Sequence, residues 1–87
     1  MKPPETLLEF REWQRLGRFR TLREDCGFRG VTVAAALGVH HATVYRWEEG
    51  AGQESPHGPP KKMAHWQMYM RVIRGMINHM EVPERDY

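Results

Sequence analysis

The segment from residue 40 to residue 49 carries side chains that can bond to phosphates and to the edges of bases. Read as a helix, it turns Val44 and Trp47 to one side, because they are three positions apart. Arg46 then faces outward and can form a forked pair of hydrogen bonds with guanine O6 and N7. Ala42 offers a methyl contact to thymine, and Tyr45 can bond to a base edge or to a phosphate. The outward set is His41, Ala42, Tyr45, Arg46 and Glu49.

A second group of residues is better placed for phosphates than for bases. His40 and Thr43 lie at the start of the same helix, where backbone N–H groups also attract anions. Arg29 precedes an earlier helix candidate, and Lys61 and Lys62 open a later one, so they complete the candidate DNA-binding set. For every residue of both groups the alternative is an ordinary solvated side chain, and the sequence alone leaves it open.

The adjacent histidines His40 and His41 raise two further hypotheses. Neighbours at a helix start do not share a face, and no cysteine pair or H-x-x-x-H spacing accompanies them. The sequence therefore indicates no metal site. Protonation of either imidazole, whose reference pKa is ~6.5, would instead add affinity for phosphate. Equal operator affinity at mildly acid and mildly alkaline pH, at fixed salt, would contradict this second hypothesis.

These side chains need a scaffold, and the residues just before them predict one. Val33, Ala34 and Leu37 share a face of a short helix, and Val39 can plug the corner that follows. Ala34 is small where two helices would cross, and Gly38 can adopt a positive φ at the bend without steric cost. Two helices, a tight turn and a free polar face on the second helix together predict a helix-turn-helix.

The positions of these residues resemble the Xre/Cro (lambda-repressor-like) type of helix-turn-helix found in phage repressors and small bacterial regulators. The resemblance covers about Phe19 to Gly50, and the run 42–48 is similar to the family's recognition helix. It implies an all-α fold that binds DNA through that helix. The residues that carry it are Ala34, Gly38, Val39, Val44 and Trp47.

The resemblance also implies one ion pair and shows two departures. Arg23 and Glu48 stand where the family often joins its first helix to the end of the recognition helix. The family's usual Ser or Thr cap and Gln at the second helix are replaced by Arg29 and Gly30, which removes a side-chain acceptor. A shorter helix capped by Thr32 is the alternative. His40 replaces the usual Ser before the recognition helix.

An amino-terminal helix over residues 5–17 carries an apolar stripe with a spacing of three. That spacing drifts by about 60° per step on an α-helix, so one straight helix cannot bury the whole stripe. We therefore expect a break near Gly17 or different partners for the two halves. Phe19, Leu22 and Cys26 would serve the helix-turn-helix core of residues 18–50. The apolar side chains that remain must be buried by the carboxy-terminal helix or by a second subunit; they are Leu7, Phe10 and Trp13.

A second long helix is predicted over residues 61–80. Its apolar stripe exceeds what a short helix-turn-helix can cover, so part of it is a candidate dimer seam. Glycines and prolines predict a loop over 51–60, and charges around Pro83 predict a frayed tail over 81–87. All these parts are assigned to one domain, residues 1–87. The stripe consists of Met63, Trp66, Met70, Ile73, Ile77 and Met80, with Tyr69 and Met76 beside it.

Composition narrows the class of protein. The chain has 87 residues, a formal net charge of +2 and one cysteine, so an internal disulfide is excluded. Arginine supplies ten of the thirteen basic residues, which suits bidentate recognition of phosphate and guanine or reflects codon usage alone. We see no membrane-length apolar run and no signal peptide, so the cytoplasm is expected. The sequence shows no pairing of a nucleophile with a base and no phosphate-binding glycine loop. We therefore expect neither enzymatic activity nor a bound cofactor or small-molecule ligand.

The sequence therefore predicts an all-α transcription regulator that binds double-stranded DNA. A homodimer on an inverted-repeat operator is expected, because a twofold protein reads half-sites one helical turn apart. The resemblance implies a repressor of a phage or mobile-element operon, with autoregulation as a candidate. The alternative is a helix-turn-helix protein-interaction module, such as an adaptor, an antitoxin or a phage packaging component. The Met- and Trp-rich stripe and the weak net charge favour that alternative.

Overall fold

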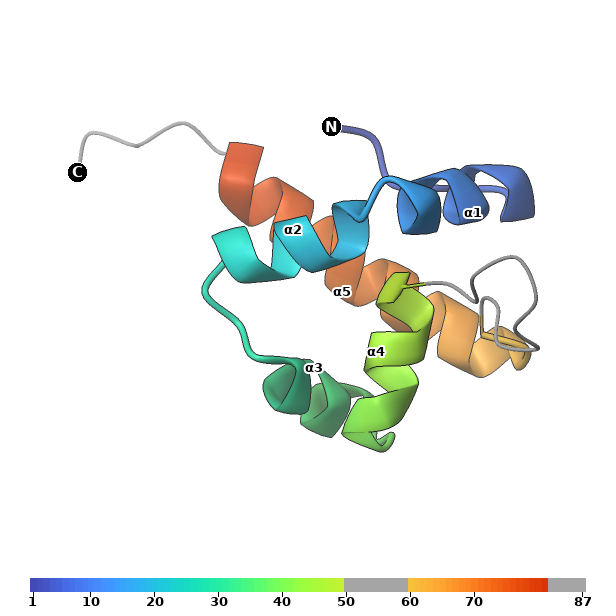
Figure 1. Ribbon diagram of the computed structural model, residues 1–87, viewed down its shortest axis with the longest axis vertical. Helices are drawn as coiled ribbons and strands as arrows, with labels where there is room; N and C mark the ends of the chain where they lie inside the picture. Colours follow the sequence, from blue (N-terminus) through green and yellow to red (C-terminus); the bar gives the residue numbers. More distant parts are fainter. Residues whose placement is uncertain (50–59, 82–87) are drawn as a thin grey trace.

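The computed structural model describes residues 1–49 and 60–81, and all regular structure within them is helical. Figure 1 shows the arrangement of the helices along the chain. Apart from Pro60 and Glu81, the predicted loop and tail lie outside the described residues, and Glu81 belongs to the last helix rather than to a tail. The helices are α1 (Leu7–Arg15), α2 (Arg18–Asp25), α3 (Gly30–Leu37), α4 (His41–Glu49) and α5 (Met63–Glu81).

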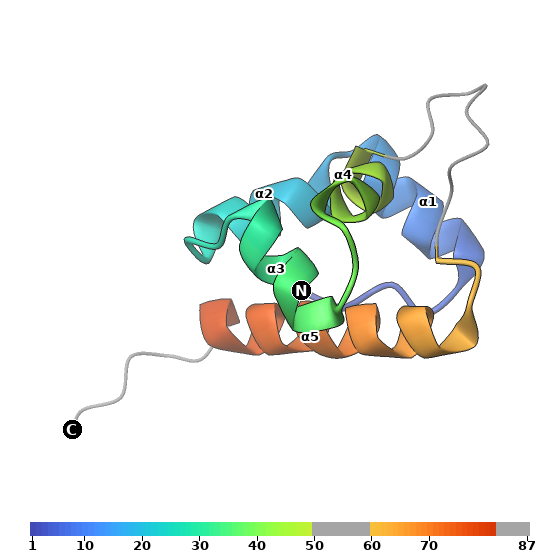
Figure 2. The same cartoon turned by 90° about the horizontal axis from the view of Figure 1, so that it is seen from below.

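The helix α5 forms one layer, and α1 to α4 lie on one side of it (Figure 2). Aromatic rings fill the space between the layers. Phe10 of α1 is fully buried, with its ring centroid 4.6 Å from that of Phe19 and 5.0 Å from that of Trp66. Tyr69 of α5 lies 5.0 Å from Trp47 of α4. The core therefore joins the helix-turn-helix to both flanking helices.

The predicted break between the first two helices is present at Gly17, whose φ is 67°. Thr6 caps α1, because its hydroxyl oxygen accepts a hydrogen bond of 3.1 Å from the backbone N–H of Glu9. Phe10 and Trp13 are covered within the chain, by α2 and α5. Leu7 is not covered, since 52% of it remains exposed. Of the two covers that the sequence allows for Leu7, the carboxy-terminal helix does not provide it, and cover by a second subunit stays a prediction.

The apolar stripe of α5 is buried in its middle and exposed at its ends. Met70, Ile73 and Ile77 belong to the core, whereas Met63 and Met80 are 69% and 45% exposed. Tyr69 and Met76, which the sequence placed beside the stripe, are buried as deeply as its centre. The buried face of α5 is therefore wider than the predicted stripe, because helices lie along most of its inner side.

Candidate nucleic-acid interface

The corner between α3 and α4 has the geometry of a tight helix-turn-helix. Gly38 has a φ of 69°, and the N–H of Val39 donates to the carbonyl of Ala34 over 3.0 Å, which closes the end of α3. Ala34 of α3 is only 3% exposed, and Val44 of α4 is fully buried. The turn therefore fixes the angle at which α4 leaves α3.

His40 caps the amino terminus of α4. Its Nδ1 accepts a hydrogen bond of 3.1 Å from the backbone N–H of Ala42, as a serine or threonine oxygen would. A protonated imidazole carries hydrogen on both nitrogens and cannot accept this bond. Protonation of His40 would therefore add charge near phosphate but remove the cap, so the pH hypothesis contains two opposing effects. In contrast, α3 begins after Arg29 with no side-chain cap, as its sequence predicts.

The pair expected between Arg23 and Glu48 is present and buried. Arg23 donates through Nε to Oε2 and through Nη2 to Oε1, the second bond being 3.1 Å long. Its Nη1 also donates to the carbonyl of Phe28 over 2.8 Å. The hydrogen bond to Glu48 raises the pKa of Arg23, although partial burial opposes this. This one guanidinium therefore ties α2 to α4 and to the segment that leads into α3.

Gln14 also holds the last turn of α4, through a contact that the sequence did not predict. Its buried amide Nε2 donates to the backbone carbonyl of Trp47 over 2.9 Å. The last carbonyls of a helix lack partners within the helix, so this bond satisfies one of them. The two residues are 33 positions apart, and no spacing pattern in the sequence links them. Gln14 also lies off the apolar stripe of this helix, so the apolar pattern gives no clue to its burial.

Tyr45 leans back from α4 onto the first turn of α3. A Cβ added to Gly30 would lie 2.5 Å from its ring and 2.6 Å from its hydroxyl oxygen. The Arg23 guanidinium carbon lies 5.9 Å from the centre of the same ring, and the His41 ring lies 6.0 Å away. The Tyr45 hydroxyl is therefore held beside the free N–H groups at the start of α3 and near Arg29. Glycine is needed at position 30 for this contact.

The other predicted contacts fall on two different parts of the molecule. His41 and Arg46 are exposed on α4, and Ala42 and Thr43 are half-buried near its start. Lys61 and Lys62 are exposed just before the first residue of α5. Arg29 and Tyr45 line one surface hollow together with Glu48 and Glu49 of α4, whereas the two lysines precede a different helix.

A family model described as a helix-turn-helix domain matches residues 15–57. The chain has an all-α helix-turn-helix fold. The matched stretch takes in α2, α3 and α4, whereas nearly all of α1 and the whole of α5 lie outside it. A domain of this kind is typical of DNA-binding transcription regulators rather than of enzymes. No curated protein and no solved structure matches the chain.

In a helix-turn-helix domain, the second of the two helices is the one that enters the major groove, and here it is α4. Within residues 1–49 and 60–81, no three histidine, cysteine or acidic side chains come together as a metal site would require. In the same residues, no helix is long and apolar enough to cross a membrane. The exposed face of α4 is therefore the candidate surface for contacts with DNA.

Proposed function

We propose that the chain is a sequence-specific transcription regulator that reads double-stranded DNA with α4. The observation that carries this proposal is how firmly α4 is held while its outer face stays free. Val44 and Trp47 anchor it in the core, Glu48 is paired with Arg23, and Gln14 bonds to its last turn. Base-specific hydrogen bonds need side chains whose positions are fixed before the DNA arrives. A helix anchored from its middle to its last turn meets that need.

Two kinds of DNA contact are assigned to this face. His41 and Arg46 point away from the domain on α4, which suits contacts with base edges, and Ala42 lies beside them for a thymine methyl. The Tyr45 ring lies against Gly30. This position favours a contact of its hydroxyl with a phosphate over a contact with a base edge, the two roles that the sequence left open. Arg29 and the uncapped N–H groups of α3 would share that phosphate.

We further infer a homodimer on an inverted-repeat operator. Two recognition helices related by a twofold axis read half-sites ~34 Å apart, which doubles the sequence that one helix can read. Two exposed leucines support the amino-terminal helix as the seam, since Leu7 and Leu8 of α1 are 52% and 79% exposed. Occupation of a promoter in the cytoplasm of a phage-infected or bacterial host would then repress it, and its own operon is the first candidate.

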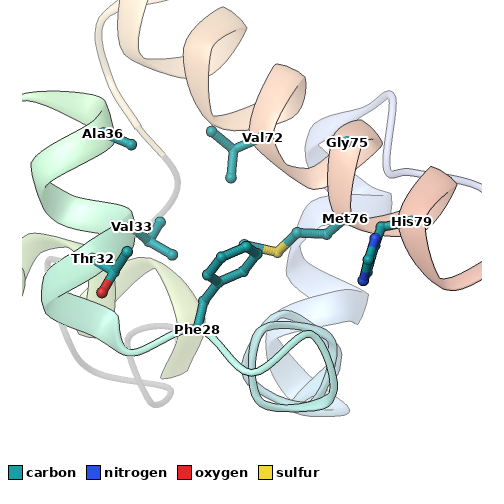
Figure 3. A pocket seen from close by; sticks show the side chains of 8 residues that line it. All are labelled: Phe28, Thr32, Val33, Ala36, Val72, Gly75, Met76 and His79. Atoms are coloured by element: carbon teal, nitrogen blue, oxygen red, sulfur yellow. The ribbon is translucent and has the colours of Figure 1, made fainter.

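Fluorescence anisotropy with the region upstream of the chain's own operon tests this proposal. Random duplex serves as competitor, and the salt concentration is varied. A regulator of this kind should prefer the upstream region and lose affinity steeply as salt rises, because phosphate contacts release counterions. No preference over random duplex would contradict the proposal. It would favour a protein-interaction module instead. The supporting observation for that module is an apolar groove between α3 and α5, which Phe28, Val72 and Met76 help to line (Figure 3).

A further inference from the structure

The helix α1 carries the proposed dimer seam near one end and a contact with the recognition helix near the other. Leu7 and Leu8 lie in its first turn and are 52% and 79% exposed. Gln14 lies in its last turn and is only 8% exposed. From Leu8 to Gln14 the helix rises by about 9 Å, at 1.5 Å per residue. The path from the seam to α4 therefore runs along one short helix.

The seam end of α1 is ordered by a capping box. The Thr6 hydroxyl accepts a hydrogen bond from the backbone N–H of Glu9 and donates one of 3.1 Å to the Glu9 carboxylate. The same carboxylate accepts a hydrogen bond of 3.3 Å from the N–H of Glu5. Reciprocal bonds of this kind satisfy N–H groups that the start of a helix leaves without partners. The two exposed leucines therefore belong to a fixed first turn.

Two kinds of contact hold the rest of α1. The ring centroid of Phe19 lies 4.6 Å from that of Phe10 and 5.0 Å from that of Trp13. Apolar contacts are not directional, so they hold α1 against the core without fixing its angle closely. The hydrogen bond of 2.9 Å from the Gln14 amide to the Trp47 carbonyl joins α1 directly to α4. Since a hydrogen bond weakens steeply when it bends, this one fixes the angle between the two helices.

A glutamine at a buried position is itself informative. A buried amide costs stability unless it is hydrogen-bonded, and here its partner is the carbonyl of Trp47. An apolar side chain would fill the same space and place no constraint on the orientation of α4. Buried polar groups can select one geometry among those that an apolar core would allow. Gln14 therefore restricts how α4 is oriented relative to α1.

We propose that Gln14 is a positioning residue that sets the half-site spacing which the dimer accepts on DNA. This inference rests on the proposed function and on its seam at α1. One added base pair rotates a half-site by about 35° and shifts it by ~3.4 Å along the duplex. A dimer whose two α4 helices are held at a fixed angle to the seam rejects such a change. Without the Gln14 bond, each α4 can turn relative to the seam and follow its half-site.

The test uses inverted repeats with the preferred spacing of half-sites and with one base pair more or fewer. The half-sites come from footprinting the region upstream of the chain's own operon. Fluorescence anisotropy measures the affinity for each duplex well below the unfolding temperature. The native chain should prefer one spacing, and in Gln14→Met this preference should fall by roughly threefold or more. An unchanged preference in a folded Gln14→Met chain would overturn the proposal.

A control variant separates positioning from stability. Ile73→Val removes a methyl group from the core and should lower stability, but it leaves the bond between Gln14 and Trp47 in place. Its spacing preference should equal that of the native chain. Circular dichroism verifies that both variants are folded at the temperature of the measurement. If Ile73→Val relaxes the preference as much as Gln14→Met does, Gln14 acts through stability alone and the proposal is overturned.

The native chain separates this inference from the proposed function in the same experiment. Specific binding to the operator with equal affinity for all three spacings would overturn the role of Gln14 but leave the DNA-binding function standing. No preference for the operator over random duplex would overturn the proposed function, and this inference with it.

Discussion

Gly30 and Tyr45 depend on each other at the scale of single residues. In an isolated helix, alanine is favoured over glycine by about 1 kcal/mol. Here the new Cβ would meet the Tyr45 ring at 2.5 Å. The atoms in the way are the far end of the Tyr45 side chain, which is 38% exposed and can turn aside, so we expect Gly30→Ala to change the stability of the native chain little but to stabilise the Tyr45→Ala variant. Urea denaturation of the four proteins gives the coupling free energy, expected at ~0.5–1 kcal/mol. Additive effects would show that the tyrosine moves aside without cost.

Arg46 is the residue on which sequence specificity should depend most. Loss of its guanidinium in Arg46→Ala should cost ~1–3 kcal/mol of binding free energy on the cognate site and relax specificity at one base pair. Anisotropy against operator variants with single base-pair changes measures both effects. Lys61→Ala is the matched loss of charge outside the α4 face and should leave specificity unchanged. If Arg46→Ala weakens random duplex as much as operator, Arg46 contacts only phosphate.

His40 should contribute to stability as a helix cap. Removing the acceptor in His40→Ala should cost ~0.5–2 kcal/mol in the free energy of unfolding, as other lost caps do. His40→Ser supplies a different acceptor for the N–H of Ala42 and should recover most of that loss. Thermal or urea unfolding at neutral pH measures the three proteins. If serine is as destabilising as alanine, the bond to Nδ1 contributes nothing to folding.

Among the elements, α1 acts as a brace for α4, although nearly all of it lies outside the family match. Its effect passes through the buried bond from Gln14 to the carbonyl of Trp47. Gln14→Met keeps a similar volume but leaves that carbonyl without its donor, which should cost ~1–3 kcal/mol in the free energy of unfolding. Urea denaturation measures the loss. Gln67→Met, at an exposed position of α5, is the control and should change stability little.

A loss in Gln14→Met no larger than in Gln67→Met would mean that water replaces the bond. If the prediction holds, hydrogen exchange should also quicken in the last turn of α4. That result would distinguish a brace for α4 from a general contribution of α1 to the core, because exchange in α2 and α3 would then change less.

The elements also show what the sequence could and could not predict. The α3–α4 corner was predictable because its signals are local: Ala34, Gly38 and Val39 lie within six residues of one another. The Arg23–Glu48 pair spans 25 positions and was available only through resemblance to a family. Contacts that depend on how α1 and α5 dock left no periodic signal. The Gln14 bond and the burial of Tyr69 are of this kind, since burial on α5 depends on which helices lie over it.

For the whole molecule, the arrangement in two layers bears on the proposed dimer. The apolar side chains in the middle of α5 are buried in the core of their own chain, so they are not accessible to a second subunit. The exposed side of α5 carries Arg71 and Arg74. Exposed apolar groups remain on both terminal helices: Leu7 and Leu8 of α1 are 52% and 79% exposed, and Met63 and Met80 of α5 are 69% and 45% exposed. Exposed apolar patches on small proteins mark interaction sites. Because Leu8 is the most exposed of these side chains and Leu7 is its neighbour, we propose α1 as the twofold seam, where the sequence left both terminal helices open.

Leu8→Glu tests that seam, because a carboxylate in each subunit would repel its symmetry mate while the exposed position tolerates it in the monomer. We expect unchanged stability of the monomer, a weaker dimer in sedimentation equilibrium and weaker binding to the full inverted repeat. Binding to a single half-site should stay as it was, since α4 is untouched. Met68→Glu places the same charge on exposed α5 and should affect neither measurement. If Met68→Glu dissociates the dimer and Leu8→Glu does not, the seam lies on α5, and the two free arginines there must then tolerate their symmetry mates.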